Sequence, residues 1–415
     1  MIPVAGSAYT FTYTTVGEIV AWVIGWDLIL EMLMAGSVVS KYWGVYLNQF
    51  FELIGWNINT NIAIGSFNFD LAPVIIVAFF TALLVMGTKI GARVDGALTI
   101  LKIAIVVFIV VVGFFYIKAE NFTPFIPPSE PAASTDGSGV SAVMEQPLWQ
   151  WVTGMAPSIY GVTGIISGAA LVFFAFLGFD VVATASEETI NPKKNVPLGI
   201  GVGLGLIIVL YTLVAIVTTG MVSYKDLAKQ SDPSLAVAFK MVGADWAAKI
   251  ISLGIVIGMA TVVMVLLLGL TRVVFAMSRD GLLPRGLSHT GKHGTPVRLQ
   301  IIVGVVMALI AACCNVGILS DMVNIGTLSA FTLVAISIPI MRKKRPDLER
   351  SFKIPGNPWV PILIALANLW LMVNLSVLTW IRFVVWLIVG FAIYFGYGYR
   401  HARLGAGELE VAAQE

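Results

Sequence analysis

The stretch FFAFLGFD, residues 173–180, has two features that a plain membrane-spanning helix avoids. Gly178 interrupts an otherwise helix-favouring run, and Asp180 follows two residues later. A helix that breaks inside a bilayer releases main-chain carbonyls, and transporters place such breaks where they bind substrate. Carbonyls released around Phe174 to Leu177 would form a negative nest suited to an ammonium group. A glycine that only permits close helix packing is the alternative, and it accounts for Gly178 but not for Asp180.

Three further ionisable residues, Asp27, Glu31 and Lys102, lie inside apolar runs. A charged side chain at the centre of a bilayer costs about 2.5 kcal/mol or more, so each is a functional candidate. Asp27 and Glu31 are four residues apart and share a helix face, which lets both point into one polar interior. Capping of, or pairing with, a neighbouring helix is the alternative. Burial disfavours the charged form of a lysine, which makes Lys102 a candidate for binding a transported proton; extension of its side chain to the cytoplasmic interface is the alternative.

Paired acids and paired bases follow in SEETINPKKNVP, residues 186–197. Pro192 and Pro197 predict that the helix ends here. Glu187 and Glu188 can then pair with the two lysines that follow them, or with another basic loop. Such a cluster is typical of a gate in a transporter, and it is equally typical of a plain loop beside the membrane.

Catalytic and metal-binding motifs are not found in the sequence. Cys313 and Cys314 are adjacent inside an apolar run, so they build neither a disulfide framework nor a four-ligand metal site. His289, His293 and His401 fall outside the apolar runs, and neither an HExxH motif nor a serine at nucleophile-elbow spacing occurs. We therefore expect no enzyme activity, no metal and no cofactor.

The elements that must position these residues are membrane helices. Of the 415 residues, 58% are hydrophobic and 12% are charged, with a mean hydropathy of +0.92, whereas charged residues make up about a quarter of a soluble domain. Runs near the length of about 20 residues that crosses a bilayer recur along the chain. This pattern predicts an all-α, polytopic membrane protein with a single transport domain over residues 1–415 and ten spans. The spans are expected at about Val16–Val39, Leu71–Gly87, Ala97–Ile117, Gly161–Ser186, Val196–Val222, Trp246–Met277, Val297–Val316, Met322–Met341, Val360–Leu378 and Phe383–Tyr399.

The basic residues indicate the orientation of these spans. Of the 25 Lys and Arg residues, 17 follow the even-numbered spans. Cytoplasmic loops hold the excess of Lys and Arg, so we expect both termini, including a tail over residues 400–415, on the cytoplasmic side. The segment 118–158 is rich in Pro, Ser, Gly and acidic residues, which predicts a long external loop.

Five motifs, in this order, carry a resemblance to a known family. The chain is similar to the amino acid–polyamine–organocation superfamily, and within it to bacterial relatives of the cationic amino acid transporters. The resemblance runs over essentially all of the chain. Its marks are PVAGSAYTFTY from Pro3, GWDLILE from Gly25, FFAFLGFDVVATASEETINPKKNVP from Phe173, AMSRDGLLP from Ala276, and NIGTLSAFTLVAISIPIMRKKRPDLERSFKIPG from Asn324.

The resemblance implies a fold of two inverted five-helix repeats, followed by two more helices, with substrate held at unwound parts of the first and sixth. The ten expected spans match the third to the twelfth helices of that pattern. The first helix and nearly all of the second are then expected to be missing from the chain. In the family, the first helix carries the glycine-rich break that receives the substrate carboxylate. The break at Phe174, Ala175 and Leu177 is the one that receives the α-ammonium.

The resemblance also implies roles for single residues. Lys102 matches the lysine of proton-coupled members that stands where sodium-coupled relatives hold a sodium ion. Glu31 and Asp180 match acidic positions in or near the pocket. Met264 falls where the pocket is expected to end, and a methionine fills space there that a serine would leave open. We therefore expect small neutral amino acids such as alanine to be preferred, with cationic ones weaker.

Two functions remain open from the sequence. The first is a permease of the plasma membrane that carries small neutral or cationic L-amino acids by alternating access, with proton symport and with no nucleic acid partner. The second is a non-transporting membrane fragment or regulatory subunit, as the missing first helices would suggest. A membrane enzyme is disfavoured because the nucleophile and metal constellations are missing.

Overall fold

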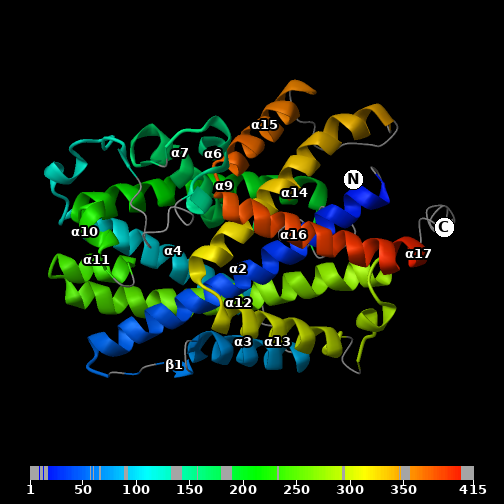
Figure 1. Ribbon diagram of the computed structural model, residues 1–415. Coiled ribbons are helices and arrows are strands. Elements are labelled where there is room, and N and C mark those ends of the chain that lie inside the picture. The colour runs from blue at the N-terminus through cyan, green and yellow to red at the C-terminus, as the bar shows by residue number, and fades with distance from the viewer. Residues whose placement is uncertain are drawn as a thin grey trace.

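The computed structural model describes residues 9, 13, 17–56, 58, 60–64, 67–87, 92–131, 143–156, 158–178, 189–230, 233–291, 295–344, 346 and 356–402. These residues form a bundle of helices with a few very short strands (Figure 1). The helices are α2 (Glu18–Leu53), α3 (Leu71–Val85), α4 (Ala92–Phe114), α6 (Leu148–Thr153), α7 (Gly161–Val172), α9 (Pro192–Met221), α10 (Tyr224–Ala228), α11 (Leu235–Met241), α12 (Asp245–Arg279), α13 (Val297–Cys313), α14 (Val316–Lys344), α15 (Trp359–Val373), α16 (Val377–Ile393) and α17 (Tyr399–His401). Single turns of 3₁₀ helix are η1 (Ala119–Phe122), η2 (Phe173–Phe176) and η4 (Arg285–Ser288), and η5 (Tyr394–Gly398) is a π-helical turn.

The apolar helices coincide with the spans that hydropathy predicts. Within the described ranges, six helical segments are long and apolar enough to cross a membrane, in α2, α4, α9, α12, α14 and the run from α16 to α17. The shorter apolar helices are α3, α7 with η2, α13 and α15. The prediction of an all-α, polytopic membrane protein is therefore confirmed.

The outer surface of the bundle is apolar where lipid would surround it. Only 6% of the most apolar stretch of α9 and 11% of that of α4 is buried inside the protein. A soluble protein rarely leaves apolar surfaces of this extent exposed. Residues such as Leu198, Val202, Leu206 and Val209 on α9 therefore face hydrocarbon rather than water.

Helix α2 is the centre of the bundle. It packs most extensively against α12 and α14, and it also contacts α3, α13 and α16 (Figure 1). At its start, the ring of Trp26 stacks on that of Trp386 in α16, with centroids 4.4 Å apart. The Trp26 indole N–H also donates to the Trp386 carbonyl over 2.9 Å. At 36 residues α2 is longer than a bilayer requires, because it continues through Lys41 into the aromatic stretch that follows.

The two ends of the described chain lie at the same end of the bundle (Figure 1). The Tyr394 hydroxyl, next to the last helical turn, donates to the Glu18 carboxylate at the start of α2 over 2.8 Å. The Tyr9 hydroxyl donates to Asp280, just after α12, over 2.9 Å. This arrangement agrees with an even number of spans. Residues 403–415 of the expected tail lie outside the described residues.

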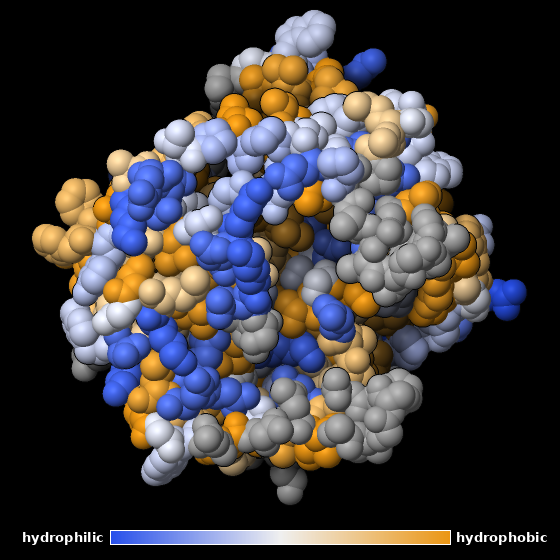
Figure 2. All heavy atoms as spheres, turned by 60° about the vertical axis from the view of Figure 1, so that its left-hand side comes forward, coloured by the Kyte–Doolittle hydropathy of each residue, from blue (hydrophilic) through white to orange (hydrophobic). Residues whose placement is uncertain are grey.

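The opposite end carries the hairpin of β1 (Asn61–Ile64) and β2 (Phe67–Asp70), together with α10 and α11. Figure 2 turns this side forward and shows hydrophilic residues gathered on it, bordered by hydrophobic ones. The segment 118–158, expected as a loop, holds η1, α6 and a strand β3 (Glu130–Pro131) that pairs with β4 (Ser158–Ile159). An ion pair of 2.9 Å between Lys225 and Glu130 ties it to α10.

Candidate substrate site

Helix α7 loses its regular α-helical geometry beside the long helices α2, α12 and α14. Its α-helical bonding ends at Val172, a 3₁₀ turn covers Phe173–Phe176, and Leu177 is extended. Gly178 follows with φ +105°, a conformation that residues with a side chain rarely adopt. The helix therefore ends where the sequence predicts an interruption, and the glycine supplies the backbone geometry for this end; residues 179–188 lie outside the described residues.

Side chains from other helices bind the main-chain carbonyls at this interruption. The Asn324 amide of α14 donates to the Leu171 carbonyl over 3.0 Å, and the Tyr211 hydroxyl of α9 donates to the Ala175 carbonyl over 2.8 Å. The Phe174 carbonyl accepts the Leu177 N–H within the turn, over 3.1 Å. A carbonyl oxygen has two lone pairs, so each of these carbonyls keeps the capacity to accept one more donor.

The interrupted segment lies where three long helices meet. Phe174 and Leu177 pack against a cluster of buried residues consisting of Ala35 of α2, Leu266 of α12 and Val323 of α14. Both side chains are half-buried and Ala175 is exposed, so the backbone here is accessible to a small ligand.

Two buried carboxylates lie on the same stretch of α2. Glu31 precedes Ala35 by one helical turn and is 1% exposed, and Asp27 is fully buried one turn earlier. Both Asp27 carboxylate oxygens are without a hydrogen bond among the described residues, and Ser329 of α14 is the polar group beside them. Burying a carboxylate without hydrogen bonds is costly, which makes this face of α2 a functional candidate.

Lys102 lies ten residues into α4 and turns toward α12. A Cβ atom built on Gly258 would lie 3.2 Å from Lys102 Cγ, and one on Gly254 would lie 2.5 Å from Ile105. Gly254 and Gly258 therefore form a small-residue face of the kind that lets membrane helices approach closely. Lys102 is half-buried in this contact.

One stripe of α12 connects Lys102 with the interruption in α7. Val262 follows Gly258 by one helical turn, and it packs against the same cluster as Phe174 and Leu177. At a rise of about 1.5 Å per residue the two contacts are about 6 Å apart along the helix. Met264 lies on a different side of α12, since two residues correspond to about 200° of rotation. It packs against the largest core cluster, between α2, α3, α12 and α13.

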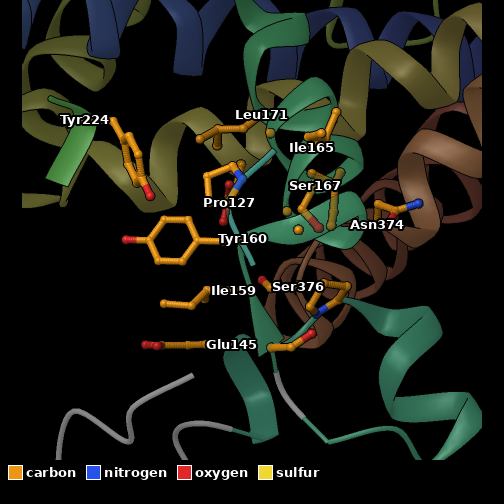
Figure 3. A pocket seen from close by; sticks show the side chains of 17 residues that line it. Pro127, Glu145, Ile159, Tyr160, Ile165, Ser167, Leu171, Tyr224, Asn374 and Ser376 are labelled. Atoms are coloured by element: carbon orange, nitrogen blue, oxygen red, sulfur yellow. The ribbon is translucent and has the colours of Figure 1, made fainter. Parts of the chain in front are cut away.

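A cavity of about 610 Å³ extends along α7 toward the interruption (Figure 3). Its inner lining includes Leu171, whose carbonyl accepts from Asn324. Two carboxylates, Glu145 before α6 and Asp321 in α14, also line it. Asp321 accepts a hydrogen bond of 3.1 Å from the Thr379 hydroxyl of α16. Figure 3 shows that Tyr160, Ser167, Asn374 and Ser376 surround the same space.

Sequence reasoning did not find the polar lining of this cavity. Asp321 is an acid beside an apolar run, but the span that hydropathy predicts begins at Met322. Glu145 and Asn374 gave no signal, because they lie in connections whose partners are distant in sequence.

Three of the residues singled out from the sequence lie outside the described residues, namely Asp180, Glu187 and Glu188. Pro192, expected to end a helix, is the first residue of α9, where a proline needs no N–H partner. Pro197 lies inside α9, near its start.

In the described part of the chain, nine apolar helices pack with α7, and ionisable side chains are buried among them, which is the architecture of a membrane transporter. The chain belongs to the amino acid permease family, whose model matches residues 1–396. Its resemblance to the amino acid–polyamine–organocation superfamily is confirmed, and with it the expectation of a transporter rather than an enzyme.

Relatives of the chain are named for several substrates. It is 41% identical to the branched-chain amino acid permease BcaP of Bacillus subtilis (strain 168), over 97% of this chain and 81% of the relative. It is 39% identical to the methylthioribose transporter of the same organism, over 97% of this chain and 81% of the relative. It is 35% identical to the mitochondrial cationic amino acid transporter 3 of Arabidopsis thaliana, over 84% of this chain and 53% of the relative.

Proposed function

We propose that this permease carries small neutral L-amino acids across the plasma membrane by alternating access and proton symport, and cationic ones more weakly. The observation that carries the proposal is the interrupted α7. Its main-chain carbonyls are accessible, are oriented by side chains of α9 and α14, and lie beside the acidic face of α2. We place both termini on the cytoplasmic side, in keeping with the distribution of basic residues.

In this proposal the carbonyls of Phe174, Ala175 and Leu177 receive the substrate α-ammonium group. An ammonium carries three N–H donors, and carbonyl dipoles in a site of low dielectric stabilise it more than they would in water. Glu31, and Asp180 beyond the described residues, supply negative charge nearby. Glu187 and Glu188 are proposed as part of a cytoplasmic gate.

Lys102 is proposed to bind the transported proton. Its packing on Gly258 connects it to the stripe of α12 that also touches the interruption. A change in its protonation would change how closely α4 and α12 pack, one helical turn from Phe174 and Leu177. This gives proton binding and substrate binding a shared structural element.

A second substrate class is branched-chain amino acids, because the relative with 41% identity is named for them. Uptake of alanine, leucine, lysine and methylthioribose into proteoliposomes tests which of these substrate classes the protein carries. We expect alanine uptake to exceed lysine uptake and to increase with an inward proton gradient. Leucine as the best substrate would favour the second class, and no uptake of any of the four would contradict a transport function.

Two substitutions test the residues. Lys102→Ala is expected to abolish proton-driven uptake, whereas Lys249→Ala, at an exposed lysine of α12, is expected to leave it unchanged. An unchanged proton dependence in Lys102→Ala would remove this lysine from the mechanism. Met264→Ser is expected to increase arginine and lysine uptake, and if it does not, Met264 does not end the pocket.

A further inference from the structure

A second cavity lies at the end of the bundle where the described chain begins and ends. Its volume is about 270 Å³, and it is bounded by the last turns of α12, the first turns of α13, and Thr290 and Thr295 between them. None of the residues proposed for substrate or proton binding lines it. Its ligand chemistry is therefore a separate question from transport.

One face of α12 forms the first wall of this cavity. Leu268, Arg272, Phe275 and Arg279 line it, and their spacings of four, three and four residues place them on one side of the helix. Arg272 is half-buried and Arg279 is exposed. The wall thus has two guanidinium groups alternating with two apolar side chains.

The second wall contains two polar atoms that make no hydrogen bond among the described residues. Gln300 is only 4% exposed, and its amide oxygen makes no hydrogen bond among the described residues. The buried hydroxyl of Thr295 is likewise without one, and both residues line the cavity. The Gln300 amide can be turned over to present its NH₂ group, and the Thr295 hydroxyl carries one O–H donor. Both side chains can therefore donate a hydrogen bond to a ligand. Both lie at the N-terminus of α13, where main-chain N–H groups favour an anion.

Among the described residues that line the cavity, the charged ones are Arg272 and Arg279. The Nε atom of Arg279 lies 3.7 Å from the Asp280 carboxylate, which is a long ion pair. The Asp280 carboxylate also accepts the Tyr9 hydroxyl over 2.9 Å. Arg279 is exposed, and this long contact leaves its guanidinium group accessible to an anion.

We propose that this cavity binds a phosphate-bearing anion, either the headgroup of an anionic phospholipid or a free phosphate ester. Arginine binds phosphate oxygens in a bidentate manner, and basic pockets between membrane helices on the cytoplasmic side bind such headgroups. Leu268 and Phe275 give the same wall an apolar strip for an acyl chain. The predicted orientation places the cavity in the cytoplasmic leaflet.

Native mass spectrometry of the full-length chain with phosphatidylglycerol tests the proposal, with phosphatidylcholine as the neutral comparison. We expect saturable binding of phosphatidylglycerol that weakens about tenfold in Arg279→Gln, which is about 1.4 kcal/mol, and further when Arg272→Gln is added. Arg298→Gln is the matched control, because Arg298 is an exposed arginine of α13 that does not line the cavity. It is expected to bind as the unaltered chain does.

Glycerol 3-phosphate added as a competitor separates the two sources of phosphate. Displacement of phosphatidylglycerol by it would show that the phosphate group is sufficient and that free esters are ligands as well. Binding that depends on Arg279 and resists competition would assign the site to lipid. Binding of phosphatidylglycerol that equals that of phosphatidylcholine, or that is the same in Arg279→Gln, would overturn the proposal. Because Arg279 is exposed, its substitution tests the site without disturbing the core.

Discussion

The hydrogen bond from Asn324 to the Leu171 carbonyl leads to a quantitative prediction. The Asn324 side chain is fully buried in α14, and it donates to the carbonyl of Leu171, just before α7 changes to the 3₁₀ turn. Asn324→Leu keeps the approximate volume and removes this donor from the carbonyl. This hydrogen bond should hold the interrupted segment in place.

The magnitude follows from typical values. A hydrogen bond contributes about 1 kcal/mol in proteins, and hydrogen bonds between membrane helices average about 0.6 kcal/mol, with a maximum near 1.7. The Asn324 amide oxygen is itself buried without a hydrogen bond among the described residues, and its removal opposes part of the loss. We therefore expect Asn324→Leu to cost about 1 kcal/mol, which increases local opening about fivefold. Asn324→Asp places a carboxylate against the carbonyl and should cost about 3 kcal/mol or more.

Hydrogen exchange measured by mass spectrometry is the appropriate assay, because it reports the free energy of local opening. The peptide that covers residues 171–178 should exchange about five times faster in Asn324→Leu. Thr327→Val is the control, since the Thr327 hydroxyl is also fully buried in α14 but binds only the Val323 carbonyl of its own helix. Unchanged exchange in Asn324→Leu, or an equal effect of Thr327→Val, would refute the role that we assign to this bond.

Three more predictions concern packing, pH and the joined ends of the chain. Gly254→Val should destabilise the fold by about 1–3 kcal/mol through overpacking against α4, whereas Gly199→Ala, where the added methyl meets open space, should not. Burial raises the pKa of Asp70, the N-cap of α3, above its ordinary 3.8. Stability should therefore fall as pH rises from about 4 through the raised value, and Asp70→Asn, which still caps the helix, should remove that part of the dependence. Tyr9→Phe, which leaves Asp280 without this donor, should cost about 1–3 kcal/mol.

Thermal unfolding in detergent at several pH values measures all three effects. Equal midpoints for Gly254→Val and Gly199→Ala would show that α4 and α12 are not closely packed. A pH profile of Asp70→Asn that matches the unaltered chain would assign the dependence to another group. An unchanged midpoint in Tyr9→Phe would mean that the Tyr9 hydroxyl contributes nothing to the joined ends.

The apolar helices were predictable from sequence, because lipid as a solvent requires long apolar runs and leaves little freedom in how they fold. The interruption of α7 was also predictable, since Gly178 lies in an apolar run. The side chains that bind the carbonyls at this interruption were not predictable. Asn324 and Leu171 are 153 residues apart, and a single sequence contains no signal that pairs them.

The extent of individual helices also depended on packing. The sequence indicated a span ending near Val39, but α2 continues to Leu53, because tertiary partners support the added turns. Among them, Ser234 donates to Gln49 over 2.8 Å, and Lys240 pairs with Glu52 over 2.9 Å. The cavity of Figure 3 shows the same limit, since its lining comes from segments between residues 127 and 376 that meet only in the folded chain.

Two carbonyls at the interruption of α7, those of Leu171 and Ala175, are bound by side chains, and this has a consequence for the rate at which the site can change. Exchanging a main-chain partner requires a helix to unwind, which is a process of microseconds or longer, whereas side chains change rotamer in picoseconds to nanoseconds. Asn324 and Tyr211 can therefore release a carbonyl to an arriving ligand and bind it again afterwards while the helices stay in place. The backbone of α7 is thereby fixed in the resting protein, and the side-chain donors of its carbonyls can still be replaced rapidly by a ligand.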